Sequence, residues 1–243
     1  MQIDEIKSDK SGIPQRAVMK AGVLPKFPFS LLLSGSSGSG KTNLLMNLLT
    51  KKEMYGAYFH YILVYSPTAN KYDDSYKVLG LPNENFVEDF GADELNALIE
   101  SRKALIDEKG IEWVGKNSRV LIILDDVIAN RAFLESQTAL TLFALLRHYL
   151  CSLVIMIQSY TKLPRALRLN CNAIAVFPAT QSEIEVLLNE ITPAGIKKRD
   201  FEKVIDYCTA DKYSFMFINR HAPRDKQIRK GLDEYIDLSQ YKS

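Results

Sequence analysis

The chain of 243 residues suits one large domain or two small ones, and no convincing linker divides it, so we expect one domain. Hydrophobic residues make up 47% and charged residues 25%, a balance that excludes an intrinsically disordered chain. The formal net charge of +2 is too small to indicate a class of partner by itself.

The sequence carries no membrane or secretion signal that we can detect. Its longest apolar runs are far too short to span a bilayer, and residues 1–5 lack the basic flank of a signal peptide. We therefore expect an intracellular protein with no membrane partner. Cys151, Cys171 and Cys208 stand far apart with no paired spacing, which favours buried free thiols over a disulfide framework or a zinc site.

Five short apolar runs predict buried strands of a mostly parallel sheet. They cover residues 29–33, 61–65, 120–124, 153–157 and 173–177. Leucine and isoleucine at helical spacing predict helices after the first, second, third and fifth of these runs. Such alternation is typical of the doubly wound α/β class, in which helices flank a central sheet.

The two ends of the chain have a different character. Residues 1–26 are polar and punctuated by glycine and proline, which predicts an N-terminal arm rather than core. Residues 27–243 are predicted to form the single domain. Within them, residues 213–218 indicate a sixth strand that precedes a basic C-terminal tail.

The glycine-rich segment at residues 35–42 fits the pattern G-x-x-x-x-G-K-[ST] at every fixed position. An apolar strand precedes it and a leucine-rich helix follows it, which is the context that a phosphate loop requires. Its glycines let backbone N–H groups turn toward phosphate oxygens at the positive end of the helix. The predicted nucleotide-binding residues are Gly35, Ser36, Ser37, Gly38, Ser39, Gly40, Lys41, Thr42 and Asn43. A Gly/Ser-rich turn that merely joins a strand to a helix is the alternative interpretation.

Within this segment Lys41 is the candidate contact for the β- and γ-phosphates, and Thr42 is the candidate Mg²⁺ ligand. Residues 120–124 lead directly into Asp125 and Asp126. Asp125 fits the acid that holds Mg²⁺ in such proteins, and Asp126 is the candidate general base for the attacking water. An Asp-Asp turn at the end of a strand is the alternative interpretation.

Three further polar residues are candidates for catalysis. Gln158 follows the strand at residues 153–157, at the end of the sheet where ligands bind in this class, so it is the candidate γ-phosphate sensor. Ring ATPases insert an arginine from one subunit into the site of the next, and Arg147 and Arg165 are the candidates for that role. Each is equally compatible with an exposed helix arginine.

Taken together, these segments resemble the FtsK–HerA superfamily, and most closely the genome-packaging ATPases of large DNA viruses and virophages. The similarity covers roughly residues 28–190. It implies a RecA-like P-loop core, hydrolysis of Mg-ATP, a homo-oligomeric ring, translocation of double-stranded DNA and a contact with a capsid protein. It also implies a location in the host cytoplasm or viral factory. Carried over by position, Arg147 occupies the place of the intersubunit arginine.

Two other functions stay open, namely a nucleotide or small-molecule kinase and an assembly protein gated by ATP with little turnover. For a DNA motor, contacts to DNA should be mostly to phosphates and independent of sequence. Residues 197–230 carry ten Lys/Arg against five Asp/Glu. Residues 197–199 and 224–230 are the candidates for gripping DNA.

Overall fold

The computed structural model describes residues 10, 12–66, 74–87, 91–126 and 131–241. Within these ranges the chain forms one sheet with the strand order β3-β2-β4-β5-β1-β6-β7-β8-β9. The strands are β1 Ser30–Ser34, β2 Tyr61–Tyr65, β3 Phe86–Val87, β4 Val120–Asp125, β5 Cys151–Ile157, β6 Ala173–Val176, β7 Met216–Asn219, β8 Ile228–Lys230 and β9 Glu234–Tyr235. All pairs from β3 to β6 are parallel, so the predicted mostly parallel α/β fold is confirmed.

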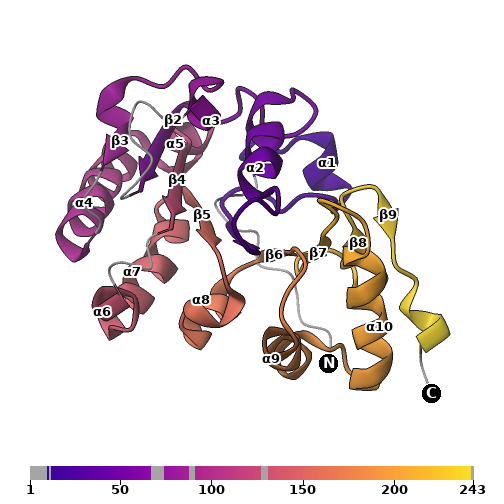
Figure 1. Ribbon diagram of the computed structural model, residues 1–243. Helices are drawn as coiled ribbons and strands as arrows, with labels where there is room; N and C mark the ends of the chain where they lie inside the picture. The colour runs from indigo at the N-terminus through magenta and orange to yellow at the C-terminus, as the bar shows by residue number, and fades with distance from the viewer. Residues whose placement is uncertain (1–9, 11, 67–73, 88–90, 127–130, 242–243) are drawn as a thin grey trace, which may run out of the picture.

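Helices cover both faces of the sheet (Figure 1). One face is covered by α4 Ala92–Lys109, α6 Arg131–Leu134, α7 Gln137–His148, α8 Arg165–Asn170, α9 Gln181–Ile191 and α10 Lys198–Thr209. The other is covered by α1 Ala17–Lys20, α2 Lys41–Thr50, α3 Asp74–Lys77 and α5 Ile111–Asn117. Neighbouring residues of a strand alternate between the two layers: Ile122 packs into the first and Leu121 into the second.

The central strands are mostly apolar because both of their faces are buried. Every residue of β1 and β5 is buried, and Leu32 lies in register with Ile155 on one side and Ile174 on the other. Parallel strands covered on both faces are expected to read as continuous apolar runs, which is why five of them could be predicted from the sequence.

The prediction of an N-terminal arm is wrong for residues 12–26. Ile13, Met19 and Leu24 are buried and pack into the core layer beneath α2 and α5. These apolar residues recur at neither helical nor strand spacing, so the sequence gives no periodic signal of their burial.

The segment predicted to be a basic C-terminal tail contains two further strands, β8 and β9. The sixth strand, β7, pairs antiparallel with β6, and β8 and β9 continue the sheet beyond it. Two of the residues predicted to grip DNA make contacts within the protein. Arg229 is buried beneath the ring of Tyr235 and donates to the carbonyl of Leu232 at 2.8 Å, and Lys230 pairs with Asp211 at 2.7 Å. Residues 197–199, Arg224 and Lys226 are exposed.

The three cysteines are buried free thiols, as predicted. None of the helices within the described ranges is both long and apolar enough to cross a bilayer.

Candidate functional site

The glycine-rich segment connects the buried strand β1 to the start of α2. Gly38 and Gly40 adopt left-handed backbone angles, with φ of +74° and +108°. An ideal Cβ at Gly35 would lie 2.6 Å from Cβ of Phe177, so only glycine fits there. Gly40 precedes α2 without a side-chain cap, which leaves the first N–H groups of the helix available to an anion.

Lys41 lies over this loop and close to the acidic pair, Asp125 and Asp126. Its ammonium donates hydrogen bonds to the carbonyls of Gly35 at 2.6 Å and Ser36 at 2.9 Å. Burial lowers the pKa of Lys41, while the nearby carboxylates of the acidic pair act against that shift. The structure therefore brings together the phosphate loop and the acidic pair, which are more than 80 residues apart in the sequence.

The acidic pair ends β4 beside the end of β5. Asp125 is in register with Met156, and the N–H of Asp126 donates to the Met156 carbonyl at 3.3 Å. Asp126 adopts a left-handed φ of +53°, a strained conformation for a residue with a side chain. The amide of Gln158 donates to Oδ2 of Asp126 at 3.0 Å, so the predicted sensor and the predicted base are in direct contact. Residues 127–130, which follow, lie outside the described residues.

Tyr76 is a site residue that the sequence analysis missed. Its hydroxyl donates to Oδ2 of Asp125 at 2.8 Å, and its side chain is almost fully buried. The ring of Tyr76 packs in the core, and its hydroxyl also orients a carboxylate. Nothing in the sequence connects two residues 49 positions apart, so no local signal could have revealed this bond.

The residues present suit a magnesium nucleotide. A hydroxyl from Thr42 and a carboxylate from Asp125 are the oxygen ligands that Mg²⁺ prefers. The hydrogen bond from Tyr76 fixes the orientation of that carboxylate, as partners of metal ligands commonly do. The described residues contain no group of three or more His, Cys, Asp or Glu that could hold a metal ion.

Arg147 lies at the amino-terminal ends of the parallel strands, whereas the phosphate loop lies at their carboxyl-terminal ends. It belongs to the last turn of α7, just before β5 begins, whereas Gln158 follows the end of β5. The seven residues of β5 separate these two ends by roughly 20 Å. Arg147 therefore does not approach the site of its own chain. Its Nε is buried without a hydrogen-bond partner among the described residues.

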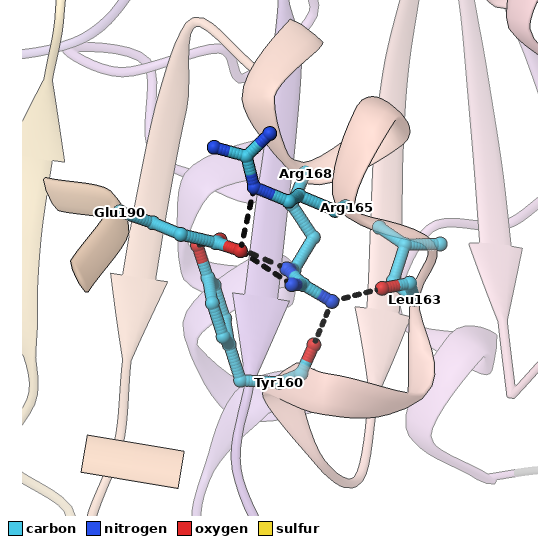
Figure 2. Close-up of polar contacts among 5 residues, drawn as sticks. All are labelled: Tyr160, Leu163, Arg165, Arg168 and Glu190. Atoms are coloured by element: carbon cyan, nitrogen blue, oxygen red, sulfur yellow. Dashed lines mark hydrogen bonds and ion pairs between the residues drawn. The ribbon is translucent and has the colours of Figure 1, made fainter. Parts of the chain in front are cut away.

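Arg165 and Arg168 lie together at α8, around Glu190 of α9 (Figure 2). Arg165 is largely exposed, with Nε 3.5 Å from Oε1 of Glu190. Arg168 is buried and donates to Glu190 at 2.6 Å and to the carbonyls of Tyr160 and Leu163. Of the two, only Arg165 presents an exposed guanidinium to a partner.

Several known proteins are similar to this chain in sequence or in fold. A family model described as "Poxvirus A32 protein" matches residues 18–234. DNA packaging protein OPG160 of Monkeypox virus is 31% identical over 182 residues, which cover 72% of this chain and 56% of that protein. OPG160 of Vaccinia virus (strain Copenhagen) is 30% identical over 182 residues, which cover 62% of its length. The chain thus spans between 56% and 62% of the length of these relatives.

Solved structures show the same fold at lower sequence identity. The genome packaging NTPase B204 from Sulfolobus turreted icosahedral virus 2, in complex with sulfate, has a TM-score of 0.55 at 16% identity. The match covers 79% of this chain and 92% of B204. The complex of B204 with AMPPCP has a TM-score of 0.53 at 13% identity, with the same coverage. The predicted P-loop fold and the resemblance to viral genome-packaging ATPases are confirmed, and the chain belongs to the poxvirus A32 protein family.

Proposed function

We propose that this chain hydrolyses Mg-ATP and uses the energy to move double-stranded DNA into a virus particle. The observation that carries the proposal is the order of three adjacent strands, β4-β5-β1. Their carboxyl ends bring the acidic pair, Gln158 and the phosphate loop to one edge of the sheet, where ligands bind in folds of this class. The DNA packaging proteins and packaging NTPases that the chain resembles support DNA as the substrate that is moved.

Each residue of this edge has a role in the proposed reaction. The phosphate loop binds the triphosphate through backbone N–H groups, and Lys41 leaves its two carbonyl partners to neutralise the β- and γ-phosphates. Thr42 and Asp125 would hold Mg²⁺, which would supply positive charge against the phosphates. Asp126 accepts a proton from the attacking water. Gln158, bonded to Asp126, positions that water against the γ-phosphate.

The proposed assembly is a homo-oligomeric ring in which Arg147 acts on the neighbouring subunit. Because Arg147 lies roughly 20 Å from Gln158 of its own chain, it can meet a nucleotide only at a subunit boundary. An arginine supplied in trans stabilises transition-state charge and is worth about 10³ or more in kcat. Arg165, exposed beside Glu190, is the second candidate for this role.

Exposed lysine and arginine residues at positions 197–199, 224 and 226 are the proposed DNA contacts. They contact phosphates without reading sequence, so binding should weaken steeply with salt. We further propose a capsid protein as partner and the host cytoplasm or viral factory as the location.

The test is steady-state ATP hydrolysis with Mg²⁺, with and without non-specific double-stranded DNA at low salt. Wild type is compared with Lys41→Ala and with Lys52→Ala, an exposed lysine just beyond α2 that serves as the matched control. We expect DNA to raise turnover several-fold in wild type and Lys52→Ala, and Lys41→Ala to be inactive. Turnover that is the same with and without DNA would contradict translocation. Phosphate transfer to an acceptor other than water would support a kinase. Tight binding of ATP without turnover would support an assembly protein.

Mixing two inactive variants tests the ring. Arg147→Ala keeps its phosphate loop and Lys41→Ala keeps its arginine, so a mixed ring contains some boundaries with both groups intact. We expect the mixture to recover a measurable fraction of wild-type turnover. An Arg147→Ala variant with wild-type activity would remove Arg147 from the mechanism.

A further inference from the structure

A pocket of about 330 Å³ adjoins the phosphate loop, on the side of β1 away from the acidic pair. Among the residues that line it are Gly40, Asn43, Asn47, Phe177, Tyr213 and Asp233. They come from the start of α2, the end of β6, the segment that enters β7 and the loop between β8 and β9. The volume falls in the range of roughly 300–1,000 Å³ that is typical of sites for small molecules.

Aromatic rings form one wall of this pocket, directly against the phosphate loop. An ideal Cβ at Gly40 would lie 3.5 Å from ring atoms of both Phe177 and Tyr213, so the two rings are in van der Waals reach of the loop backbone. Phe177 packs on Phe215 with ring centroids 5.1 Å apart. The wall therefore begins where the phosphates of a bound nucleotide would end.

Tyr213 is the exposed member of this wall. Its side chain is 56% exposed, and its backbone has a left-handed φ of +66°. A turn holds it there, in which the N–H of Asp211 donates to Oγ of Ser214 at 3.0 Å and the N–H of Ser214 donates to the Asp211 carbonyl at 3.0 Å. A large exposed aromatic residue in a strained conformation costs free energy, and such residues concentrate at ligand sites.

Polar side chains also line the pocket. The amide of Asn47 donates both to the carbonyl of Asn43 at 2.8 Å and to its Oδ1 at 2.9 Å. These bonds fix both amides and leave the Asn47 oxygen as an acceptor and the Asn43 nitrogen as a donor. Asp233 adds a carboxylate and Lys51 an ammonium. An aromatic wall together with fixed donors and acceptors suits a flat ring with polar edges.

We propose that this pocket binds the purine base of the nucleotide whose phosphates lie on residues 35–42, an inference that rests on the function proposed above. The γ-phosphate must point toward Gln158 and Asp126, on the β5 and β4 side of β1. The other end of the nucleotide then points toward β6 and β7, where the pocket lies. Tyr213 stacks on the base, and Asn43, Asn47 and Asp233 meet its polar edges.

The test measures the affinity of two ligands, Mg-ATP and Mg-tripolyphosphate, by calorimetry. Tripolyphosphate carries the phosphates without the base. Tyr213→Ala should weaken ATP binding about five-fold or more, because stacking of a base on an aromatic ring contributes about 1–3 kcal/mol. It should leave the affinity for tripolyphosphate unchanged, which also shows that the variant is folded. Tyr213→Phe should retain ATP binding, and wild type should prefer ATP and GTP over CTP and UTP.

Tyr61→Ala is the matched control, since Tyr61 is similarly exposed (58%) but lies at the start of β2, outside the pocket. Equal ATP affinity in Tyr213→Ala and wild type would overturn the inference alone. Equal loss of both ligands would also overturn it, because the effect would then lie in the phosphate loop. If wild type bound neither ligand, the proposed ATPase function would fail and this inference with it.

Discussion

Replacing Arg168 by alanine should lower the free energy of unfolding, because it breaks a buried ion pair with Glu190. The side chains of Arg168 and Glu190 are only 7% and 5% exposed, and they are joined at 2.6 Å (Figure 2). Removing the guanidinium leaves the carboxylate buried with the Tyr160 hydroxyl at 3.0 Å as its main partner. It also removes the donor to the carbonyls of Tyr160 and Leu163. Breaking a buried pair in this way costs about 3–5 kcal/mol.

The assay is equilibrium unfolding in urea, with Arg165→Ala as the matched control. Arg165 approaches the same carboxylate at 3.5 Å, but its side chain is 70% exposed. An exposed ion pair contributes about 0–1 kcal/mol, so this variant should unfold almost like wild type. The two substitutions remove the same side chain within one helix and differ mainly in burial.

Two results would refute this reasoning. One is a loss of less than about 1 kcal/mol in Arg168→Ala, and the other is an equal loss in both variants. The comparison also bears on function. If Arg165→Ala is as stable as wild type, a loss of DNA-stimulated turnover in that variant cannot be attributed to unfolding and would support Arg165 as the residue that acts in trans.

Four further outcomes are expected. The stability difference between wild type and Arg168→Ala should narrow as pH falls below about 4.3 in urea titrations. Burial raises the pKa of Glu190, but hydrogen bonds from Arg168 and Tyr160 outweigh that effect, so the pKa is lowered in the folded protein. The ionised Glu190 therefore stabilises the fold above the pKa that it has in the unfolded chain. This stabilisation is lost as pH falls through its pKa in the folded protein. Met19→Ala should lower the free energy of unfolding in urea by about 2–5 kcal/mol, whereas Lys20→Ala, at the exposed neighbouring residue, should leave it unchanged. An unchanged free energy of unfolding in Met19→Ala would mean that this segment is dispensable to the core. Tyr76→Phe should raise the Mg²⁺ concentration for half-maximal hydrolysis about ten-fold, because Asp125 loses its orienting donor, and an unchanged Mg²⁺ titration would dismiss that role. Gln158→Ala should lower kcat about 100-fold with KM nearly unchanged in steady-state kinetics, while a rise in KM alone would mean that Gln158 only binds.

The sequence was sufficient to predict five of the six parallel strands of the described residues; β3, which has only two residues, was not predicted. Strands buried on both faces are largely apolar runs. The phosphate loop is a local pattern in which left-handed backbone angles require glycine at positions 38 and 40, and close packing against Phe177 requires it at position 35. The sequence of helix α10 also contains an apolar pattern that indicates a helix. Phe201, Val204, Ile205 and Cys208 are all buried and recur at helical spacing.

Other features depend on contacts between distant segments. The burial of Met19 and the bond between Tyr76 and Asp125 follow from tertiary packing, and neither has a periodic pattern. The basic character of residues 224–230 suggested an exposed grip, but Arg229 is held under Tyr235, which lies six residues later on the next strand. Charge alone predicts exposure on average and cannot identify the cation that packs on a ring.

The change from parallel to antiparallel pairing at β6 connects the fold to the proposed chemistry. A parallel neighbour of β6 would have ended at the same edge as β1 and contributed another carboxyl-terminal loop. Instead β7 begins at this edge, so Tyr213 and Phe215 arrive beside the phosphate loop from the segment that enters a strand. Parallel strands on one side of β1 thus carry the groups proposed for hydrolysis, and the wall proposed for the base lies on the other side, at the end of β6 and the segment that enters β7. This division explains why substitutions on the β4–β5 side should change kcat, whereas those on the β6–β7 side should change nucleotide affinity.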